Sequence, residues 1–145
     1  MLQPEMKTGS HYRVLSTIAV TRFSTLYLAF DEQTKHEVVI KTPNQLDKGH
    51  LRVLRNESLL LQRLNHSSIP KVFDSFIEND RFHLIMEYIS GKSLADRLAE
   101  RGEAFSEQDV RHWLMILLDI LIYLHEQQSP ILHRDIKPEN IHIDA

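Results

Sequence analysis

The stretch ILHRDIKPENIHIDA, residues 131–145, places a dense group of charged and amide side chains between apolar residues. Its central eight residues, HRDIKPEN at 133–140, contain two cations, two carboxylates, a histidine and an amide. Pro138 restricts the backbone between Lys137 and Asn140. This pattern predicts a loop that carries chemistry, with Asp135, Lys137 and Asn140 as the candidate residues.

The bulk composition limits what the rest of the chain can be. The 145 residues are enough for one domain with a buried core. Apolar content of 42% and charged content of 26% are typical of a soluble globular protein. The net charge of −3 gives no reason to expect a nucleic-acid partner. Because the sequence has no cysteine, disulfides, thiolate zinc sites and cysteine nucleophiles are excluded.

Targeting and membrane segments are not expected. The first residues lack a positive region followed by an apolar core, so no signal peptide is predicted. The most apolar stretch, Trp113 to Leu124, is interrupted by Asp119 and is shorter than the roughly 20 residues needed to span a bilayer. The sequence therefore predicts a cytoplasmic protein without a membrane segment.

The order of secondary structure predicts an α+β fold. Residues rich in β-branched and aromatic side chains predict strands at 12–19, 23–30, 36–43, 71–78 and 81–89. Leucines at helical spacing from Leu51 predict a helix that ends near Asn65. Ser93 and Ser106 are predicted N-caps of two later helices, and Gly102 is the predicted residue after the first of them. An antiparallel sheet with one helix, followed by a helical part, is expected.

The helix that begins after Ser106 and runs to about Gln128 is apolar on nearly all sides. Such a helix is expected to be buried by several neighbours. Little sequence remains after it to cover it. The sequence therefore predicts an exposed apolar helix, open to self-association or to a partner.

Four motifs, in order, resemble the N-terminal lobe and catalytic loop of eukaryotic-type (Hanks-type) serine/threonine protein kinases. They are VVIK at 38–41, Glu57, LIMEY at 84–88 and HRDIKPEN at 133–140. The resemblance extends from Tyr12 to the last residue. It implies a kinase-like fold, with a small antiparallel β lobe with one helix over 11–89 and an incomplete helical lobe over 90–145. Residues 1–10, which contain Pro4 and Gly9, are expected to be a flexible lead-in. The family's Asp-Phe-Gly motif, expected after Asn140, is absent from this sequence.

The resemblance implies transfer of the γ-phosphoryl group of ATP to serine or threonine hydroxyls of a protein substrate. Such a reaction needs cations on the phosphates, a metal ligand and a carboxylate that orients the hydroxyl. Asp135 is expected to orient the hydroxyl, Lys137 to contact the transferring phosphate and Asn140 to bind Mg²⁺. The alternative for the same residues is a charged surface loop, which a motif of eight residues makes improbable.

By the same resemblance, nine positions are expected to contact the nucleotide: Ile18, Leu26, Val39, Lys41, Glu57, Met86, Glu87, Ile89 and His142. Lys41 is expected to contact the α- and β-phosphates and to pair with Glu57. Because Glu57 lies within a stripe of leucines, an inward-facing partner is predicted for its carboxylate. Val39 and His142 depart from the family, which usually has alanine and an apolar residue there.

The glycine-rich loop of the family is missing its glycines. Ala19, Thr21 and Ser24 stand at the three glycine positions. Glycines permit positive φ and let backbone N–H groups come close to phosphates. The substitutions predict a stiffer loop held farther from the phosphates, and so weaker ATP binding.

Two other functions fit parts of the sequence. A non-catalytic, pseudokinase-like binding or regulatory module would account for the glycine-free loop and the exposed helix, although Lys41, Glu57, Asp135 and Asn140 are all retained. A small-molecule phosphotransferase of the aminoglycoside type shares the two-lobed plan, but the HRDIKPEN form fits it poorly. Because the Asp-Phe-Gly ligand is absent, this chain alone is predicted to be inactive.

Overall fold

The computed structural model describes residues 2–44 and 48–143, without the side chains of 48–53. The chain forms two compact units. Unit 1 comprises Met1–Asn65 and Pro70–Tyr88, and unit 2 comprises His66–Ile69 and Ile89–Ala145.

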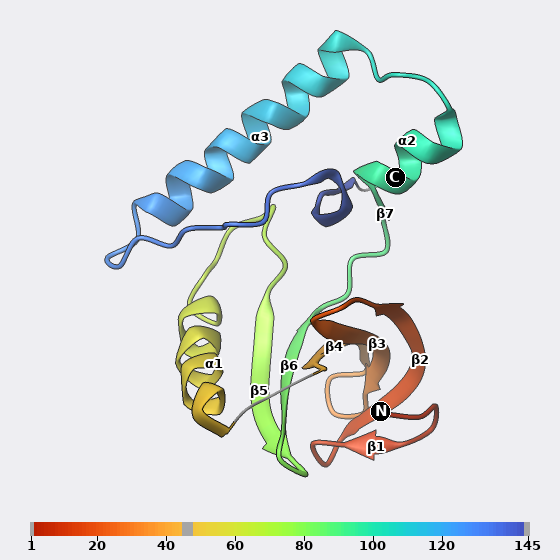
Figure 1. Ribbon diagram of the computed structural model, residues 1–145, viewed down its shortest axis with the longest axis vertical. Helices are drawn as coiled ribbons and strands as arrows, with labels where there is room; N and C mark the ends of the chain where they lie inside the picture. Colours follow the sequence, from red (N-terminus) through yellow and green to blue (C-terminus); the bar gives the residue numbers. More distant parts are fainter. Residues whose placement is uncertain (1, 45–47, 144–145) are drawn as a thin grey trace. The chain divides into compact units, whose positions relative to one another are not determined.

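Unit 1 is a six-stranded antiparallel sheet with one helix (Figure 1). The strand order is β1-β2-β3-β4-β6-β5. The strands are β1 Lys7–Thr8, β2 Tyr12–Val20, β3 Ser24–Asp31, β4 His36–Pro43, β5 Val72–Glu78 and β6 Arg81–Glu87. Helix α1, Lys48–Leu61, packs beside β5, where the Ser58 and Ser75 hydroxyl oxygens lie 2.7 Å apart.

The two faces of this sheet differ in character, because alternate residues of a strand point to opposite sides. One face, called here the core face, carries the buried side chains Tyr12, Val14, Tyr27, Ala29, Val38, Ile40 and Ile85. The other, called the Lys41 face, carries Leu26 opposite Lys41 and Val39 opposite Met86. Burial of the core face removes apolar area from water and supplies the main stabilisation of unit 1.

The N-terminal residues are part of the sheet, which differs from the lead-in expected over residues 1–10. Lys7 and Thr8 pair with Arg13 and Tyr12, and the Thr8 side chain is fully buried against the Glu78 carboxylate. Gly9, with φ of 55°, brings the backbone against the Phe76 ring. A segment containing Pro4 and Gly9 gives little strand signal, so the two-residue strand was not predicted.

Strand β2 is irregular along its length. Its register with β3 shifts between Val14 and Ser16 and again between Thr17 and Ala19. On its other side, β2 pairs with β1 at Tyr12 and Arg13, and Val14 exchanges backbone hydrogen bonds with residues 5 and 6. Beyond Val14, no strand within the described ranges pairs with this edge of β2.

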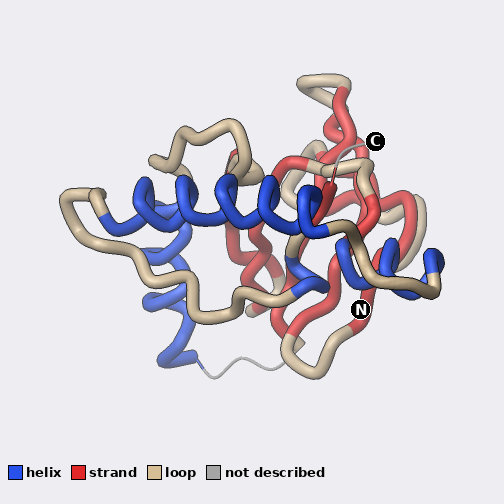
Figure 2. Tube along the Cα trace, turned by 90° about the horizontal axis from the view of Figure 1, so that it is seen from above, coloured by secondary structure: helices blue, strands red, loops and turns tan. Residues whose placement is uncertain are grey.

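Unit 2 consists of two helices and a small two-stranded sheet. Its elements are β7 Lys92–Ser93, α2 Leu94–Arg101, α3 Glu107–His125, the 3₁₀ helix η1 Pro138–Asn140 and β8 His142–Ile143. After α3 the chain turns back, with the Ile131 N–H donating to the Leu124 carbonyl at 3.0 Å, and returns alongside the helix (Figures 1 and 2). The return brings η1 beside β7, which pairs with β8.

The predicted helix caps are confirmed. The Ser93 hydroxyl accepts a hydrogen bond from the Asp96 N–H, and the Ser106 hydroxyl accepts one from the Asp109 N–H. Gly102 follows α2 in the left-handed conformation, with φ of 70°. Each side-chain acceptor satisfies one N–H group that the first turn of a helix cannot pair internally.

Helix α3 exposes much of its apolar surface, as expected. Leu124 is its only buried residue, whereas Leu114, Met115, Leu118 and Ile122 are each more than half exposed. The helix nevertheless ends at His125, before the predicted Gln128. None of the helices in the described part of the chain has the length and apolar character needed to cross a lipid bilayer.

Candidate active site

Asp135, Lys137 and Asn140 form one hydrogen-bonded cluster in unit 2. The Asn140 side-chain nitrogen donates to the Asp135 Oδ2 and to the Asp135 backbone carbonyl, both at 2.8 Å. The Lys137 ammonium lies 3.1 Å from the other carboxylate oxygen, Oδ1. The structure therefore brings together the three residues predicted to handle the hydroxyl, the phosphate and the metal.

The local backbone explains how three side chains so close in sequence can meet. Pro138 occupies the start of η1, where its missing N–H is not needed. The Asn140 N–H closes this short turn on the Lys137 carbonyl at 2.9 Å. Arg134 adopts a φ of 64°, a conformation that costs about 1 kcal/mol for a residue with a Cβ. Such strain concentrates at functional segments.

The cluster keeps the Asp135 carboxylate ionised. Hydrogen bonds from Lys137 and then from Asn140 hold the pKa of Asp135 below its ordinary value, with a further contribution from the Lys137 charge. Its side chain is 63% exposed, so an incoming hydroxyl can reach it. An ionised, accessible carboxylate can accept a hydrogen bond from a substrate hydroxyl and orient it.

Asn140 is the candidate metal ligand of this cluster. Its side-chain nitrogen donates to Asp135. Its Oδ1 oxygen accepts no hydrogen bond from the described residues, so this oxygen remains available to a metal ion. No group of three or more histidine, aspartate or glutamate side chains within the described ranges could hold a metal. Mg²⁺ commonly takes one or two protein oxygens and completes its octahedron with water and phosphate oxygens. The Asn140 oxygen can therefore serve as one protein ligand of a Mg²⁺ ion that is otherwise bound by water and phosphate.

In unit 1, the Lys41 face brings together residues from three neighbouring strands. Leu26 of β3 lies opposite Lys41 of β4, and Val39 of β4 lies opposite Met86 of β6. Val39 is buried, whereas the Lys41 side chain is exposed. The face thus offers an apolar surface with an ammonium group at one end, as an adenine nucleotide requires.

The expected pair between Lys41 and Glu57 is not formed. Both side chains are exposed, and no ion pair joins Lys41 to Glu57. Lys41 also forms no ion pair with any other described residue. Glu57 was predicted to face inward with the leucine stripe. The next residue, Ser58, faces inward instead, 1% exposed and bonded to Ser75. Successive residues of an α-helix are about 100° apart around its axis, so neighbours such as Glu57 and Ser58 can face solvent and the packed side, respectively.

The remaining predicted contacts are divided between the units. In unit 1, Ile18 lies exposed in the irregular part of β2, and the Glu87 N–H donates to the Lys71 carbonyl at 2.8 Å. In unit 2, Ile89 is half-buried and His142 lies on β8, with its Nδ1 3.1 Å from the Gly91 carbonyl. Their roles toward a nucleotide stay predictions.

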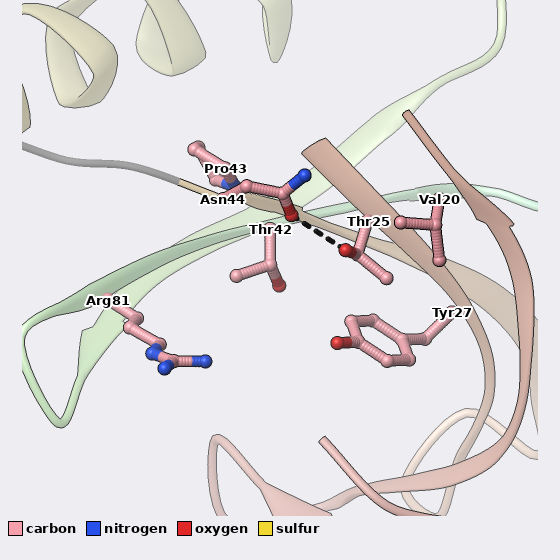
Figure 3. A pocket seen from close by; sticks show the side chains of 7 residues that line it. All are labelled: Val20, Thr25, Tyr27, Thr42, Pro43, Asn44 and Arg81. Carbon is pink, nitrogen blue, oxygen red and sulfur yellow. Dashed lines mark hydrogen bonds between the residues drawn. The ribbon is translucent and has the colours of Figure 1, made fainter. Parts of the chain in front are cut away.

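A pocket of about 200 Å³ opens on the opposite side of the sheet from the Lys41 face. It is lined by Val20, Thr25, Tyr27, Thr42, Pro43, Asn44 and Arg81 (Figure 3). Thr25 and Tyr27 alternate along β3 with Leu26, and Thr42 follows Lys41 on β4, so the pocket is on the core face. It is therefore not the expected nucleotide site.

Comparison with known proteins agrees with this architecture. The kinase domain of Mycobacterium tuberculosis PknI superposes with a TM-score of 0.84 at 22% identity, over 97% of this chain and 56% of that one. Human serine/threonine-protein kinase Nek11 is 33% identical over 95% of this chain. Myosin light chain kinase A of Dictyostelium discoideum is 34% identical over 82% of it.

Fold and site thus define a kinase-type architecture, a small sheet lobe followed by a segment in which Asp135, Lys137 and Asn140 form one cluster. The protein kinase domain family model matches residues 12–145, and the chain belongs to that family. The predicted family and α+β fold class are confirmed. The chain spans 22% of the length of Nek11 and 40% of myosin light chain kinase A.

Proposed function

We propose that this chain is part of a serine/threonine protein kinase that transfers the γ-phosphoryl group of Mg-ATP to a protein hydroxyl. The observation that carries the proposal is the cluster of Asp135, Lys137 and Asn140, with the carboxylate ionised and accessible. The relatives at 33–34% identity are serine/threonine-protein kinases by name, which supports a hydroxyl of serine or threonine as the acceptor.

Each residue of the cluster has a distinct role in this proposal. Asp135 accepts a hydrogen bond from the substrate hydroxyl and points its oxygen at the phosphorus. Because the pKa of Asp135 is lowered, it serves chiefly to orient the hydroxyl and takes up its proton late in the reaction. Lys137 leaves the carboxylate to neutralise charge on the transferring group. Asn140 would hold Mg²⁺ through its amide oxygen, and the ion would supply positive charge to the phosphates.

Nucleotide binding is assigned to the Lys41 face of unit 1. Leu26, Val39 and Met86 supply the apolar surface for the base, and the Lys41 ammonium supplies charge for the phosphates. Glu57 is exposed in this structure, so its predicted pairing with Lys41 requires a rotation or shift of α1. We therefore propose that the arrangement of α1 in this structure is an inactive one.

The exposed apolar residues of α3 are assigned to a surface that other protein residues cover. Leu114, Met115, Leu118 and Ile122 lie within two and a half turns of one another, and each is more than half exposed. Exposed apolar patches of this kind mark contact with other protein surface. We expect either further kinase residues or another copy of the chain to cover them.

The decisive test is the variant Asp135→Asn, assayed in this chain and in any longer natural polypeptide that contains it. Transfer of phosphate from ATP to a generic protein substrate is expected to fall by about 10²-fold or more in the longer form, because the carboxylate is lost. Mg-ATP binding, followed by thermal shift, should be unchanged. The chain alone is expected to show little transfer with or without the substitution.

The matched control is Glu126→Gln, which removes one exposed carboxylate of unit 2 that accepts no hydrogen bond within the described part of the chain. It should leave transfer intact. Loss of binding together with transfer in Asp135→Asn would contradict the role assigned to Asp135. Absence of Mg-ATP binding in the longer polypeptide would favour the alternative function, a non-catalytic binding module.

A further inference from the structure

The turn between β2 and β3 is closed by its own side chains. The Thr21 hydroxyl oxygen accepts hydrogen bonds from the Phe23 N–H at 3.3 Å and from the Ser24 N–H at 3.0 Å. The same hydroxyl lies 2.9 Å from the Ser24 carbonyl, to which it donates. The Thr21 N–H also donates to that carbonyl, at 2.9 Å. Three backbone N–H groups of this turn are therefore committed within it.

Asn44, immediately after β4, fixes the turn from the neighbouring strand. Its N–H donates to the Phe23 carbonyl at 2.9 Å, and its side-chain nitrogen donates to the Thr21 carbonyl at 2.7 Å. Its side-chain oxygen accepts a hydrogen bond from the buried Thr25 hydroxyl at 2.7 Å (Figure 3). All three of these polar groups of Asn44 are thus used to hold the turn.

The turn lies close to Lys41 along the sheet, since it joins β2 to the strand that pairs with Lys41. Lys41 is directly opposite Leu26, which is two residues from the end of the turn at Ser24. Backbone N–H groups in a turn can hold phosphate only if they are free to point at it. Here, the Phe23 and Ser24 N–H groups already have an acceptor in the Thr21 hydroxyl. A phosphate would have to displace that hydroxyl before it could bind them.

We propose that Thr21 and Asn44 form a clamp that withholds the β2–β3 turn from the nucleotide, so that phosphate affinity rests on Lys41 and opening the clamp increases it. This proposal rests on the proposed function, because it concerns the same nucleotide site. Thr21 and Asn44 are positioning residues, since they act through the backbone N–H groups of Phe23 and Ser24. The clamp sets how tightly successive phosphates of the nucleotide are held.

Thr21→Val tests the clamp, because valine keeps the branched shape of threonine and removes the hydroxyl. Amide hydrogen exchange of Phe23 and Ser24, measured without nucleotide, is expected to accelerate about tenfold, as loss of one acceptor predicts. Thr21→Ser, which retains a hydroxyl, should preserve the protection. Asn44→Ala, a second way to open the clamp, should accelerate the same two amides.

Affinities for adenosine, ADP and ATP with Mg²⁺ are then compared by chemical-shift titration of each variant. Opening the clamp should leave adenosine affinity unchanged and raise ATP affinity by about fivefold to tenfold, with ADP between them, because only phosphates use the released N–H groups. Faster exchange with an unchanged ratio of ATP to adenosine affinity overturns the clamp alone. Absence of binding by all three ligands in every variant overturns the proposed nucleotide site as well.

Discussion

Unit 1 and unit 2 differ in how completely they bury their apolar side chains. In unit 1, the core face of the sheet buries seven apolar or aromatic side chains, and strand β1 adds the buried Thr8 to the same sheet. In unit 2, the long helix α3 has a single buried residue, Leu124. The difference indicates that unit 1 holds its structure through a core of its own, whereas unit 2 relies on caps, hydrogen bonds and local contacts.

Among substitutions that test this difference, Gly9→Ala is expected to have the largest effect on the stability of unit 1. A Cβ at Gly9 would lie 2.5 Å from the tip of the Phe76 ring, and φ is 55°. The ring has little room to move, because it stacks on Tyr12 with centroids 6.0 Å apart. We expect the free energy of unfolding of unit 1 to fall by about 2–4 kcal/mol, measured by urea unfolding.

Gly102→Ala provides the matched control, since Gly102 also has a positive φ, of 70°, but no atom lies within 4 Å of an added Cβ. Only the backbone penalty of about 1 kcal/mol is expected there. Equal destabilisation by the two substitutions would contradict the close approach of Gly9 to the Phe76 ring.

A smaller effect is expected from Ser106→Ala in unit 2. The Ser106 hydroxyl accepts the Asp109 N–H at 3.1 Å and donates to the Asp109 carboxylate at 2.7 Å. Loss of this cap should destabilise α3 by about 1 kcal/mol, seen as reduced helical signal in far-ultraviolet circular dichroism. Ser129→Ala, at an exposed position after the helix, should change nothing. An unchanged helical signal in Ser106→Ala would show that contacts other than the cap determine the stability of α3.

The smallest effect concerns pH and the core of unit 1. His83 is 1% exposed, and its Nδ1 lies 2.8 Å from the Thr42 hydroxyl. Burial lowers the pKa of His83 below its ordinary value of 6.5. The unfolded chain therefore binds a proton more readily than the folded chain. The contribution of His83 to stability is complete above pH 6.5 and is lost as the pH falls toward the lowered pKa.

The measurement is the slope of unfolding free energy against pH below 6.5, compared between the natural sequence and His83→Asn. Asparagine keeps an acceptor for Thr42 and cannot take up a proton, so the slope should become shallower in the variant. His36→Asn, at an exposed position of the sheet, serves as the control. An identical slope in all three proteins would place the pH dependence elsewhere.

Most of the fold was predictable because its signals are local. The strands at 12–19 and 36–43 are rich in β-branched residues, and Ser93, Gly102 and Ser106 are strong cap residues, so each was found from its own neighbourhood. Strand β1 was missed because pairing with β2, rather than its own composition, makes it a strand.

In the candidate site too, the features set by nearby residues were predictable and those set by packing between distant residues were not. Asp135, Lys137 and Asn140 are close in sequence, and the motif that contains them predicted their meeting. The inward orientation predicted for Glu57 was wrong, because the leucine stripe of α1 leaves its phase open by one residue and Ser58 takes the packed position. The hydrogen bonds of Asn44 to the β2–β3 turn join residues about twenty positions apart, and no sequence pattern marks them.

The two register shifts of β2 bear on how copies of this chain avoid joining edge to edge. The free edge of β2 beyond Val14 includes Ile18 and Val20, both exposed, and a flat edge of that composition would template pairing with another chain. The bulges bend the strand and leave residues unpaired, so a second strand cannot align with it over its length. Deleting one residue at each of the two bulges would restore a regular edge and, with it, a route to aggregation.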